Sequence, residues 1–193
     1  MDLSLLDKSS GVTPILVRLY DSHKLYGLAK DKEPGARAEL TSAVSALLEM
    51  KLSPREGELV ADVLMSLMRQ TEKDLRVAIS EKLSVTDNVP LRLILQISND
   101  EIDVAAPILR NSTVLGELDL AYIIKSKSAE YWREIASRKM LSDYVMNMLA
   151  DTKDFDTAMA LAKNMSVKLS EHVLVVLSDL AQKSEAIAAP LLR

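Results

Sequence analysis

The sequence contains no cysteine, which excludes disulfide bonds, thiolate nucleophiles and zinc sites with cysteine ligands. This absence fits a reducing compartment, and we expect a cytoplasmic protein. No apolar run reaches the roughly 18 residues that a membrane-spanning helix needs, and the N-terminus lacks the basic and apolar regions of a signal peptide. We therefore expect neither a membrane segment nor a secretory leader.

Aromatic residues, glycine and proline are also scarce. The chain has one Phe, one Trp, 5 Gly and 6 Pro among 193 residues, so aliphatic side chains must fill the interior. No segment alternates β-branched or aromatic residues with polar ones, as a half-buried strand would. We predict an all-α fold. The net charge of −4 gives no overall attraction for polyanions.

A seven-residue segment occurs twice in nearly the same form. Val104-Ala-Ala-Pro-Ile-Leu-Arg110 returns as Ile187-Ala-Ala-Pro-Leu-Leu-Arg193, and weaker echoes place an Ala after an aliphatic residue at 78, 136 and 162. A Leu followed by Ser or Gly runs in phase, beginning at 52, 83, 115, 141 and 169. A period of roughly 28 residues is typical of stacked helix pairs, because each unit holds two short helices.

The repeat predicts about five helix pairs in one continuous domain, residues 52–193, behind N-terminal lead-in and capping helices in residues 1–51. Proline and capping residues place the first helix of each pair after Ser53, Val89, Gly116, Ser142 and Ser170. Partner helices are expected to start near Thr71, Asp100, Ser128, Asp154 and Lys183. In the capping region, one helix is expected from Thr13 to Tyr26 and another from Leu40 to about Lys51.

Two prolines interrupt this scheme. Pro107 and Pro190 lie in or just past the middle of partner helices, where proline costs about 3 kcal/mol. We expect a kink or a helix start at each. The chain also stops at Arg193 inside a repeat, with no polar capping unit, which predicts either a longer natural chain or contact with a second copy at that end.

Several of these segments resemble an alphaproteobacterial family of unknown function, the domain of unknown function 2336 family, which is related to HEAT-like repeats. The segments are Leu52-Ser-Pro-Arg-Glu56, Asp74-Leu-Arg-Val-Ala78 and Val104-Ala-Ala-Pro-Ile-Leu-Arg-Asn-Ser112, within a likeness over roughly residues 36–193. The resemblance implies a HEAT-like α-solenoid in a bacterial protein. It implies no catalytic residues.

Residues that carry chemistry elsewhere have ordinary explanations here. His23 and His172 are far apart and have no partner at metal-ligand spacing. The acidic clusters at 99–103 and 151–156 lack the central Gly and the final Glu of a calcium loop, and carboxylates at helix N-termini are favoured by the helix dipole. We expect no catalytic residue, metal or cofactor, and interpret the protein as non-enzymatic.

Basic residues gather near the ends of the predicted partner helices: Lys82, Arg110, Arg138, Lys139, Lys163, Lys168 and Arg193. Stacking superposes equivalent positions, so these side chains form a ladder along one edge if all are exposed. Such a ladder would suit nucleic acid, which is the alternative to our main interpretation. Cations are also favoured at helix C-termini by the dipole, and acidic residues outnumber basic ones.

Tyr131 and Trp132 stand out against the repeat. Aligned on Ala136, they occupy positions that are mostly polar in the other units, such as Lys73 and Asp74. Exposed, the pair would be a binding hot spot; alternatively, the unit has shifted register and Trp132 is buried between layers.

The leading hypothesis is an interaction scaffold that binds a protein or peptide on the solenoid surface. Its candidate contact residues are Tyr131, Trp132, Arg110, Arg138, Lys139 and Lys163.

Overall fold

The computed structural model describes residues 27–28, 34–48 and 54–182. Within residues 34–48 and 54–182 the chain forms ten α-helices and no strand, which confirms the predicted all-α class. The helices are α3 Pro34–Leu48, α4 Pro54–Gln70, α5 Lys73–Ser84, α6 Leu91–Ser98, α7 Ile102–Asn111, α8 Glu117–Ser126, α9 Ala129–Ala136, α10 Asp143–Asp151, α11 Phe155–Lys163 and α12 Glu171–Ala181.

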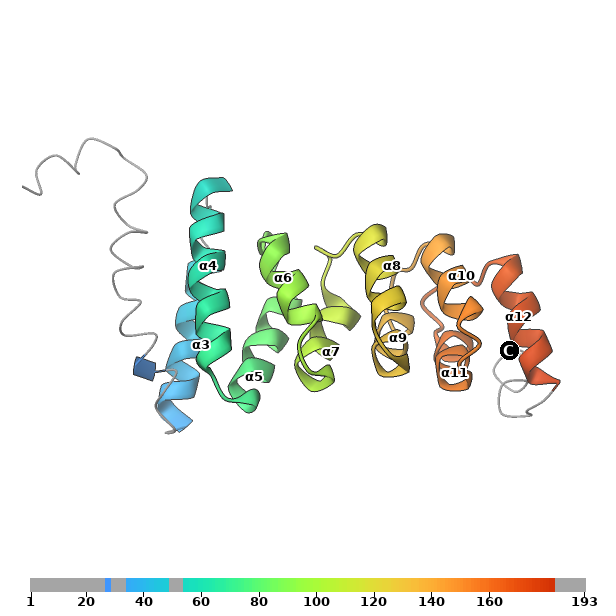
Figure 1. The fold of residues 1–193 in the computed structure, drawn as a ribbon, viewed down its shortest axis with the longest axis horizontal. Helices are drawn as coiled ribbons and strands as arrows, with labels where there is room; N and C mark the ends of the chain where they lie inside the picture. Colours follow the sequence, from blue (N-terminus) through green and yellow to red (C-terminus); the bar gives the residue numbers. More distant parts are fainter. Residues whose placement is uncertain (1–26, 29–33, 49–53, 183–193) are drawn as a thin grey trace, which may run out of the picture.

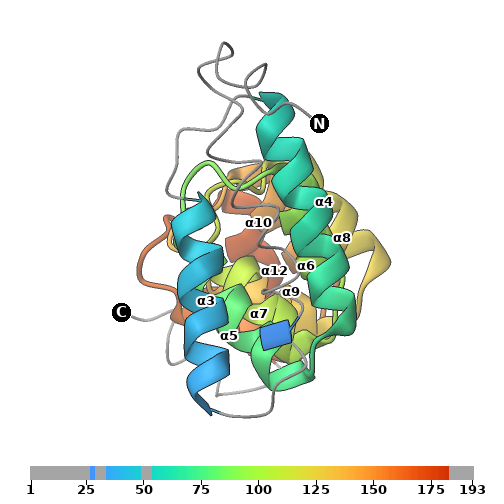
Figure 2. The ribbon, with the colours of Figure 1, turned by 90° about the vertical axis from the view of Figure 1, so that its left-hand side faces the viewer.

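The helices lie in two rows along the longest axis of the molecule (Figures 1 and 2). The first-helix row contains α4, α6, α8, α10 and α12, and the partner row contains α3, α5, α7, α9 and α11. Consecutive members of the partner row pack directly on one another, whereas in the first-helix row α6 and α8 have little contact. The connections after α5, α7, α9 and α11 run along one edge of this stack (Figure 1).

Local capping explains where several helices begin. The hydroxyl oxygens of Ser142 and Ser170 accept hydrogen bonds from backbone amides in the first turns of α10 and α12, and the Asp154 carboxylate does the same for α11. Each side chain satisfies an amide that has no partner within the helix. The predicted starts after Gly116, Ser142 and Ser170, and near Ser128 and Asp154, are therefore confirmed.

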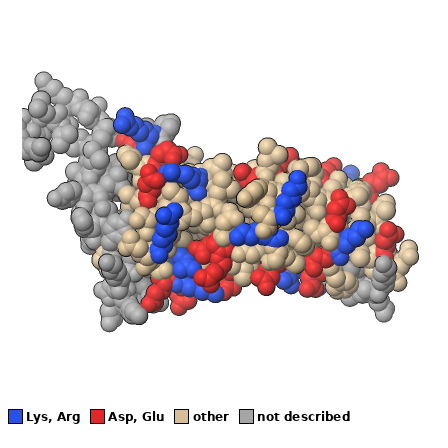
Figure 3. Space-filling view, viewed as in Figure 1, with Lys and Arg blue, Asp and Glu red and all other residues tan. Residues whose placement is uncertain are grey.

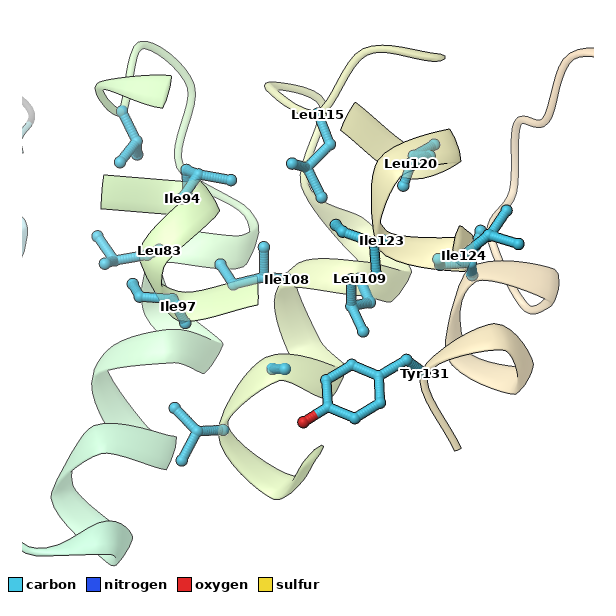
Figure 4. Packing of buried hydrophobic residues seen from close by; sticks show 14 of the residues in the cluster. Leu83, Ile94, Ile97, Ile108, Leu109, Leu115, Leu120, Ile123, Ile124 and Tyr131 are labelled. Atoms are coloured by element: carbon cyan, nitrogen blue, oxygen red, sulfur yellow. The ribbon is translucent and has the colours of Figure 1, made fainter. Parts of the chain in front are cut away.

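A continuous aliphatic core lies between the two rows. Figure 4 shows Leu83, Ile97 and Ile108 facing this interior, and all three are essentially inaccessible to solvent. Ala105 and Ala136 are fully buried in α7 and α9, which pack against each other, in keeping with the small residue that recurs in the repeat. Because each helix pair alone would expose its apolar face, stacking is what removes this surface from water.

Pro107 lies inside α7, which begins at Ile102, so the alternative of a helix start at Pro107 is wrong. Proline removes the amide that would have bonded the Asp103 carbonyl, and its ring crowds the same carbonyl. Val104, Ile108 and Leu109 of the same helix are fully buried. Burial of each such side chain contributes about 1.5–3 kcal/mol, which offsets the cost of one proline.

Polar side chains connect each partner helix to the next. The Arg76 guanidinium on α5 donates to the Asp100 carboxylate just before α7, with Nε–Oδ2 at 3.0 Å. On α9, Arg133 donates to Asp156 of α11, with Nη1–Oδ2 at 3.2 Å. The Asn164 amide, after α11, donates to the carbonyl of Ala136 at 2.8 Å. These links join successive units at both ends of the partner row, because Asp100 and Asp156 lie where α7 and α11 begin, whereas Asn164 lies where α11 ends.

Some predictions fall on residues outside the described ranges. They are the helix from Thr13 to Tyr26, the cap at Ser53, the partner helix near Lys183, and the features at Pro190 and Arg193. The division at residue 52 also stays a prediction.

Candidate protein-binding groove

Tyr131 is buried in α9 and does not occupy an exposed position. Its hydroxyl donates to the backbone carbonyl of Asp100 at 2.6 Å, and the Lys127 ammonium lies 5.0 Å from the centre of its ring. Burial, together with the negative charges of Asp100 and Glu130, raises the pKa of this phenol. Tyr131 therefore joins neighbouring helix pairs, and the hypothesis of an exposed Tyr131 hot spot is wrong.

Trp132 is half-buried and packs against the core. Its indole Nε1–H donates to the carbonyl of Ile124, at the end of α8, at 2.8 Å. Its indole is thus fixed within its own helix pair, so the buried alternative is closer to the structure than the exposed one. The polar residues at the equivalent positions of other units do not indicate this burial. Trp132 packs between α8 and α9, and Tyr131 contacts Asp100 just before α7.

Arg138 is also buried, with 8% of its surface exposed, which contradicts its placement in an exposed ladder. Its guanidinium donates to the backbone carbonyls of Leu109 at 2.7 Å and Ser112 at 2.6 Å, at the C-terminal end of α7. Burial lowers the pKa of Arg138 from its ordinary value. The side chain stabilises the carbonyls of the preceding partner helix, a position that the helix dipole favours for a cation.

The other candidate cations are exposed, and the structure separates them. Arg110 pairs with Glu134 on α9, and the hydrogen bond to that carboxylate raises the pKa of the guanidinium. Lys139, Lys163 and Lys168 have no side-chain partner among the described residues. Lys163 lies in the last turn of α11, apart from the groove described next, so the predicted ladder is not continuous.

A groove of about 950 Å³ runs along the edge where the connections after α5, α7, α9 and α11 lie. It collects three of the six predicted contact residues, Arg110, Arg138 and Lys139, and adds Lys168. Two carboxylates also line it, those of Glu117 and Asp143. Its apolar lining includes Val85, Leu115, Leu120, Met140, Leu141 and Val145.

The rim of this groove exposes large apolar side chains. Met140 is 81% exposed and Val85 is 71% exposed, whereas Leu115 and Leu120 below them are buried. Met140 and Val85 could not be predicted from the sequence, because neither belongs to a repeat marker or to a helix face. The arrangement combines an apolar floor, exposed apolar rim residues and cationic side chains, which are the components of a binding surface.

The acidic clusters are occupied by contacts within the protein. Arg76 and Lys73 pair with Asp100, Glu101 and Asp103. In the second cluster, Asp154 caps α11, Asp156 pairs with Arg133 and Asp151 contacts His172. Among the described residues, no group of three or more His, Cys, Asp and Glu side chains is placed to hold a metal ion.

His172 has a carboxylate partner that sequence spacing did not reveal. Its Nε2 lies 2.7 Å from Asp151 Oδ1, and both side chains are exposed at the surface between α10 and α12. The contact joins neighbouring first helices, as Arg92 on α6 does with Asp62 on α4 at 2.6 Å. His23 lies outside the described residues.

The fold and the groove define a class: an all-α protein of paired helices stacked in two rows, with a groove along the edge where successive pairs connect. Residues 104–193 match the model of a family described as an uncharacterised protein conserved in bacteria (DUF2336). The resemblance to this bacterial family is thus confirmed over these residues, which are a little less than half of the chain. No curated protein and no solved structure matches the chain at a significant level. No helix in the described ranges has the length and apolar character to cross a membrane.

Proposed function

We propose that the chain is a HEAT-like solenoid of about five helix pairs behind an N-terminal helical cap, and that it serves as a non-enzymatic scaffold for a protein or peptide partner. The observation that carries this proposal is the groove, because it crosses the connections after four successive partner helices. Stacked repeats characteristically bind along surfaces that several units build together. A segment of polypeptide is the ligand that such a surface suits.

The composition of the groove supports a protein ligand. Exposed Met140 and Val85 on its rim are apolar side chains that water contacts in the free protein, and covering them stabilises a complex. Methionine suits such a role because its unbranched side chain adapts to different partners. The open rim also favours a segment laid along the groove over a small molecule enclosed within it.

The alternative function, nucleic-acid binding, has weaker support. Arg138 is buried and Arg110 is paired with Glu134, which leaves Lys139 and Lys168 as the free cations of the groove. Glu117 and Asp143 stand in the same lining and would repel a phosphate backbone. Blue and red side chains are mixed over the face in Figure 3, without a continuous basic stripe. Nucleic-acid affinity depends on many simultaneous phosphate contacts, so this surface suits a polypeptide better.

The lack of cysteine fits a cytoplasmic protein. A non-enzymatic role is supported by the structural contacts of the acidic clusters, which occupy their side chains. Assembly with a second copy through the C-terminal end is a further proposal, on residues outside the described ranges.

Two matched variants test the role of the groove. Met140→Asp places a charge on its rim, whereas Met165→Asp places one on an equally exposed methionine, at 82%, outside the lining. The full-length wild-type protein and both variants are immobilised, and the proteins each retains from a native cell extract are identified by mass spectrometry. We expect the wild-type protein and Met165→Asp to retain the same partner and Met140→Asp to lose it. Equal retention by all three, or nuclease-sensitive binding of nucleic acid instead, contradicts the proposal.

A further inference from the structure

Arg138 is a buried cation without a carboxylate partner among the described residues. Two of its nitrogens donate to backbone carbonyls, and its Nε has no hydrogen-bond partner. Buried charges are ordinarily paired, because removing an ion from water costs several kcal/mol. The side chain nevertheless lines the groove, so its positive charge lies at the wall of a space that a ligand can enter.

The rim reinforces this charge. Lys139 and Lys168 are exposed, line the groove and have no side-chain partner among the described residues. The helix N-termini contribute little, because α8 begins with Glu117 and its Gly116 amide is bonded to Asp119, while α10 carries Asp143 in its first turn. The attraction for an anion therefore comes from cationic side chains.

The excess of positive charge is small. Four cations line the groove, but Glu134 neutralises Arg110, and Glu117 and Asp143 stand in the lining itself. The lining thus keeps an excess of one positive charge, so it favours a ligand with one or two negative charges over a polyanion. Leu141 and Val145 also line the groove, between Lys139 and Lys168 in the sequence. They offer contacts for apolar side chains next to the anionic group of the ligand.

We infer that the partner docks through an acidic peptide segment, with one or two Glu or Asp side chains beside apolar residues, whose carboxylate lies among Arg138, Lys139 and Lys168. This inference rests on the proposed function, since it names the chemistry of the ligand in the same groove. It assigns the two lysines to recognition of charge and the apolar residues to recognition of the neighbouring side chains. The carboxylate then provides the counter-charge that Arg138 lacks in the free protein.

Fluorescence anisotropy with labelled synthetic peptides tests the inference on the full chain. The acidic pool contains peptides of about ten residues, long enough to follow an extended groove, with two central Glu residues flanked by Leu, Met or Phe. The neutral pool replaces each Glu by Gln. We expect the acidic pool to bind at least about tenfold more tightly and to weaken as salt is raised, because salt screens charge interactions.

Charge-reversal variants locate the contact. The double substitution Lys139→Glu and Lys168→Glu is expected to weaken binding of the acidic pool by about tenfold or more. Lys163→Glu is the matched control, because Lys163 is an exposed lysine outside the lining, and its binding should stay within about twofold. These lysines are preferred to Arg138 for the test because its loss would also disturb the carbonyls of α7.

Three other results would contradict the inference, the proposed function or both. Equal binding of the neutral and acidic pools, with loss in Met140→Asp, overturns the acidic anchor and leaves the proposed function standing. Failure of both pools to bind also overturns the inference, and the retention experiment with Met140→Asp then decides the proposed function separately. Tighter binding of a single-stranded DNA oligonucleotide than of either pool overturns both.

Discussion

The two rows of helices differ in the side-chain contacts that join successive units. In the partner row, buried or half-buried polar side chains reach from one unit to the next, as Tyr131, Arg76 and Arg138 do. In the first-helix row, the corresponding links are exposed pairs such as Arg92 with Asp62 and His172 with Asp151. The first-helix row also exposes large apolar side chains, among them Leu59, Leu91, Leu118, Tyr122, Tyr144, Leu174 and Val175.

This difference suggests that the two rows contribute differently to stability. The partner row sets the spacing of the units, because its links are partly shielded from solvent and each joins fixed backbone positions. The first-helix row contributes one apolar face to the core, and its other face is exposed to solvent. We therefore expect the loss of shielded contacts in the partner row to reduce stability more than substitutions at exposed positions, and the variants below test this.

The largest expected effect comes from removing core volume in the partner row. Ile108→Ala truncates a side chain that is fully buried in α7, and such truncation typically lowers the free energy of unfolding by about 2–5 kcal/mol. Leu118→Ala is the matched change in α8, where 78% of the side chain is exposed, and should stay within about 0.5 kcal/mol. Urea denaturation measures both. Similar losses in the two variants would mean that burial of Ile108 between the rows does not set the cost of its truncation.

The next effect comes from the buried arginine. Arg138→Met keeps most of the side-chain volume but leaves the carbonyls of Leu109 and Ser112 without their donor. We expect a loss of about 1–3 kcal/mol, because desolvation of the unpaired charge offsets part of what the hydrogen bonds contribute. Lys139→Met, at the adjacent exposed position, is the control and should change stability by less than about 0.5 kcal/mol. An unchanged melting temperature in Arg138→Met would show that these two hydrogen bonds do not contribute to stability.

A smaller loss of stability is expected from removing the hydroxyl of Tyr131. Tyr131→Phe removes the hydrogen bond to the Asp100 carbonyl, which should cost about 1 kcal/mol. Tyr122→Phe provides the control, since Tyr122 is 63% exposed and its hydroxyl has no partner among the described residues. Equal stability of both variants and the wild-type protein would rule out the proposed link between helix pairs.

The same residue predicts a dependence on alkaline pH. The pKa of Tyr131 in the folded protein is raised above its ordinary value of 10.0, mainly by burial and then by nearby Asp100 and Glu130. As pH rises above 10.0, the phenol ionises first in the unfolded chain, which stabilises the unfolded state. The wild-type protein should therefore lose stability relative to Tyr131→Phe from that pH upward, through the raised pKa. A constant difference between the two proteins across this range would contradict the shift.

The smallest effects concern ion pairs, which double-mutant cycles can compare. Arg76 and Asp100 in the partner row have side chains that are 17% and 25% exposed, against 48% and 60% for Arg92 and Asp62 in the first-helix row. We expect a coupling energy of about 1 kcal/mol for the first pair and about 0.2–0.5 kcal/mol for the second. The reverse order would mean that shielding from solvent does not set the strength of these links.

The helices themselves were largely predictable from sequence. Ser142, Asp154 and Ser170 each cap a helix through the residue three positions later, so their signals are local and readable from a few residues. The apolar spacing in the repeats likewise predicts which side chains face the core. Helix starts and the all-α class follow from such short-range patterns.

The site was less predictable because its contacts span many residues. Arg138 was expected near a helix C-terminus, and it is, but the carbonyls it binds belong to a helix 26 and 29 residues earlier in the chain. Tyr131 reaches a carbonyl 31 residues away, so alignment with polar equivalents could not indicate its burial. Met140 could not be predicted, because a single methionine in the connection between α9 and α10 is part of no periodic pattern.

Arg138 and Asn164 each donate to backbone carbonyls of the preceding unit, and this pattern bears on the order in which units unfold. Each polar bridge between units, such as those of Arg138, Asn164 and Tyr131, joins a unit only to its immediate neighbour, so the loss of one unit at an end leaves the bridges further along unbroken. We therefore expect heating to separate the units successively from the ends of the described array, with the middle persisting longest.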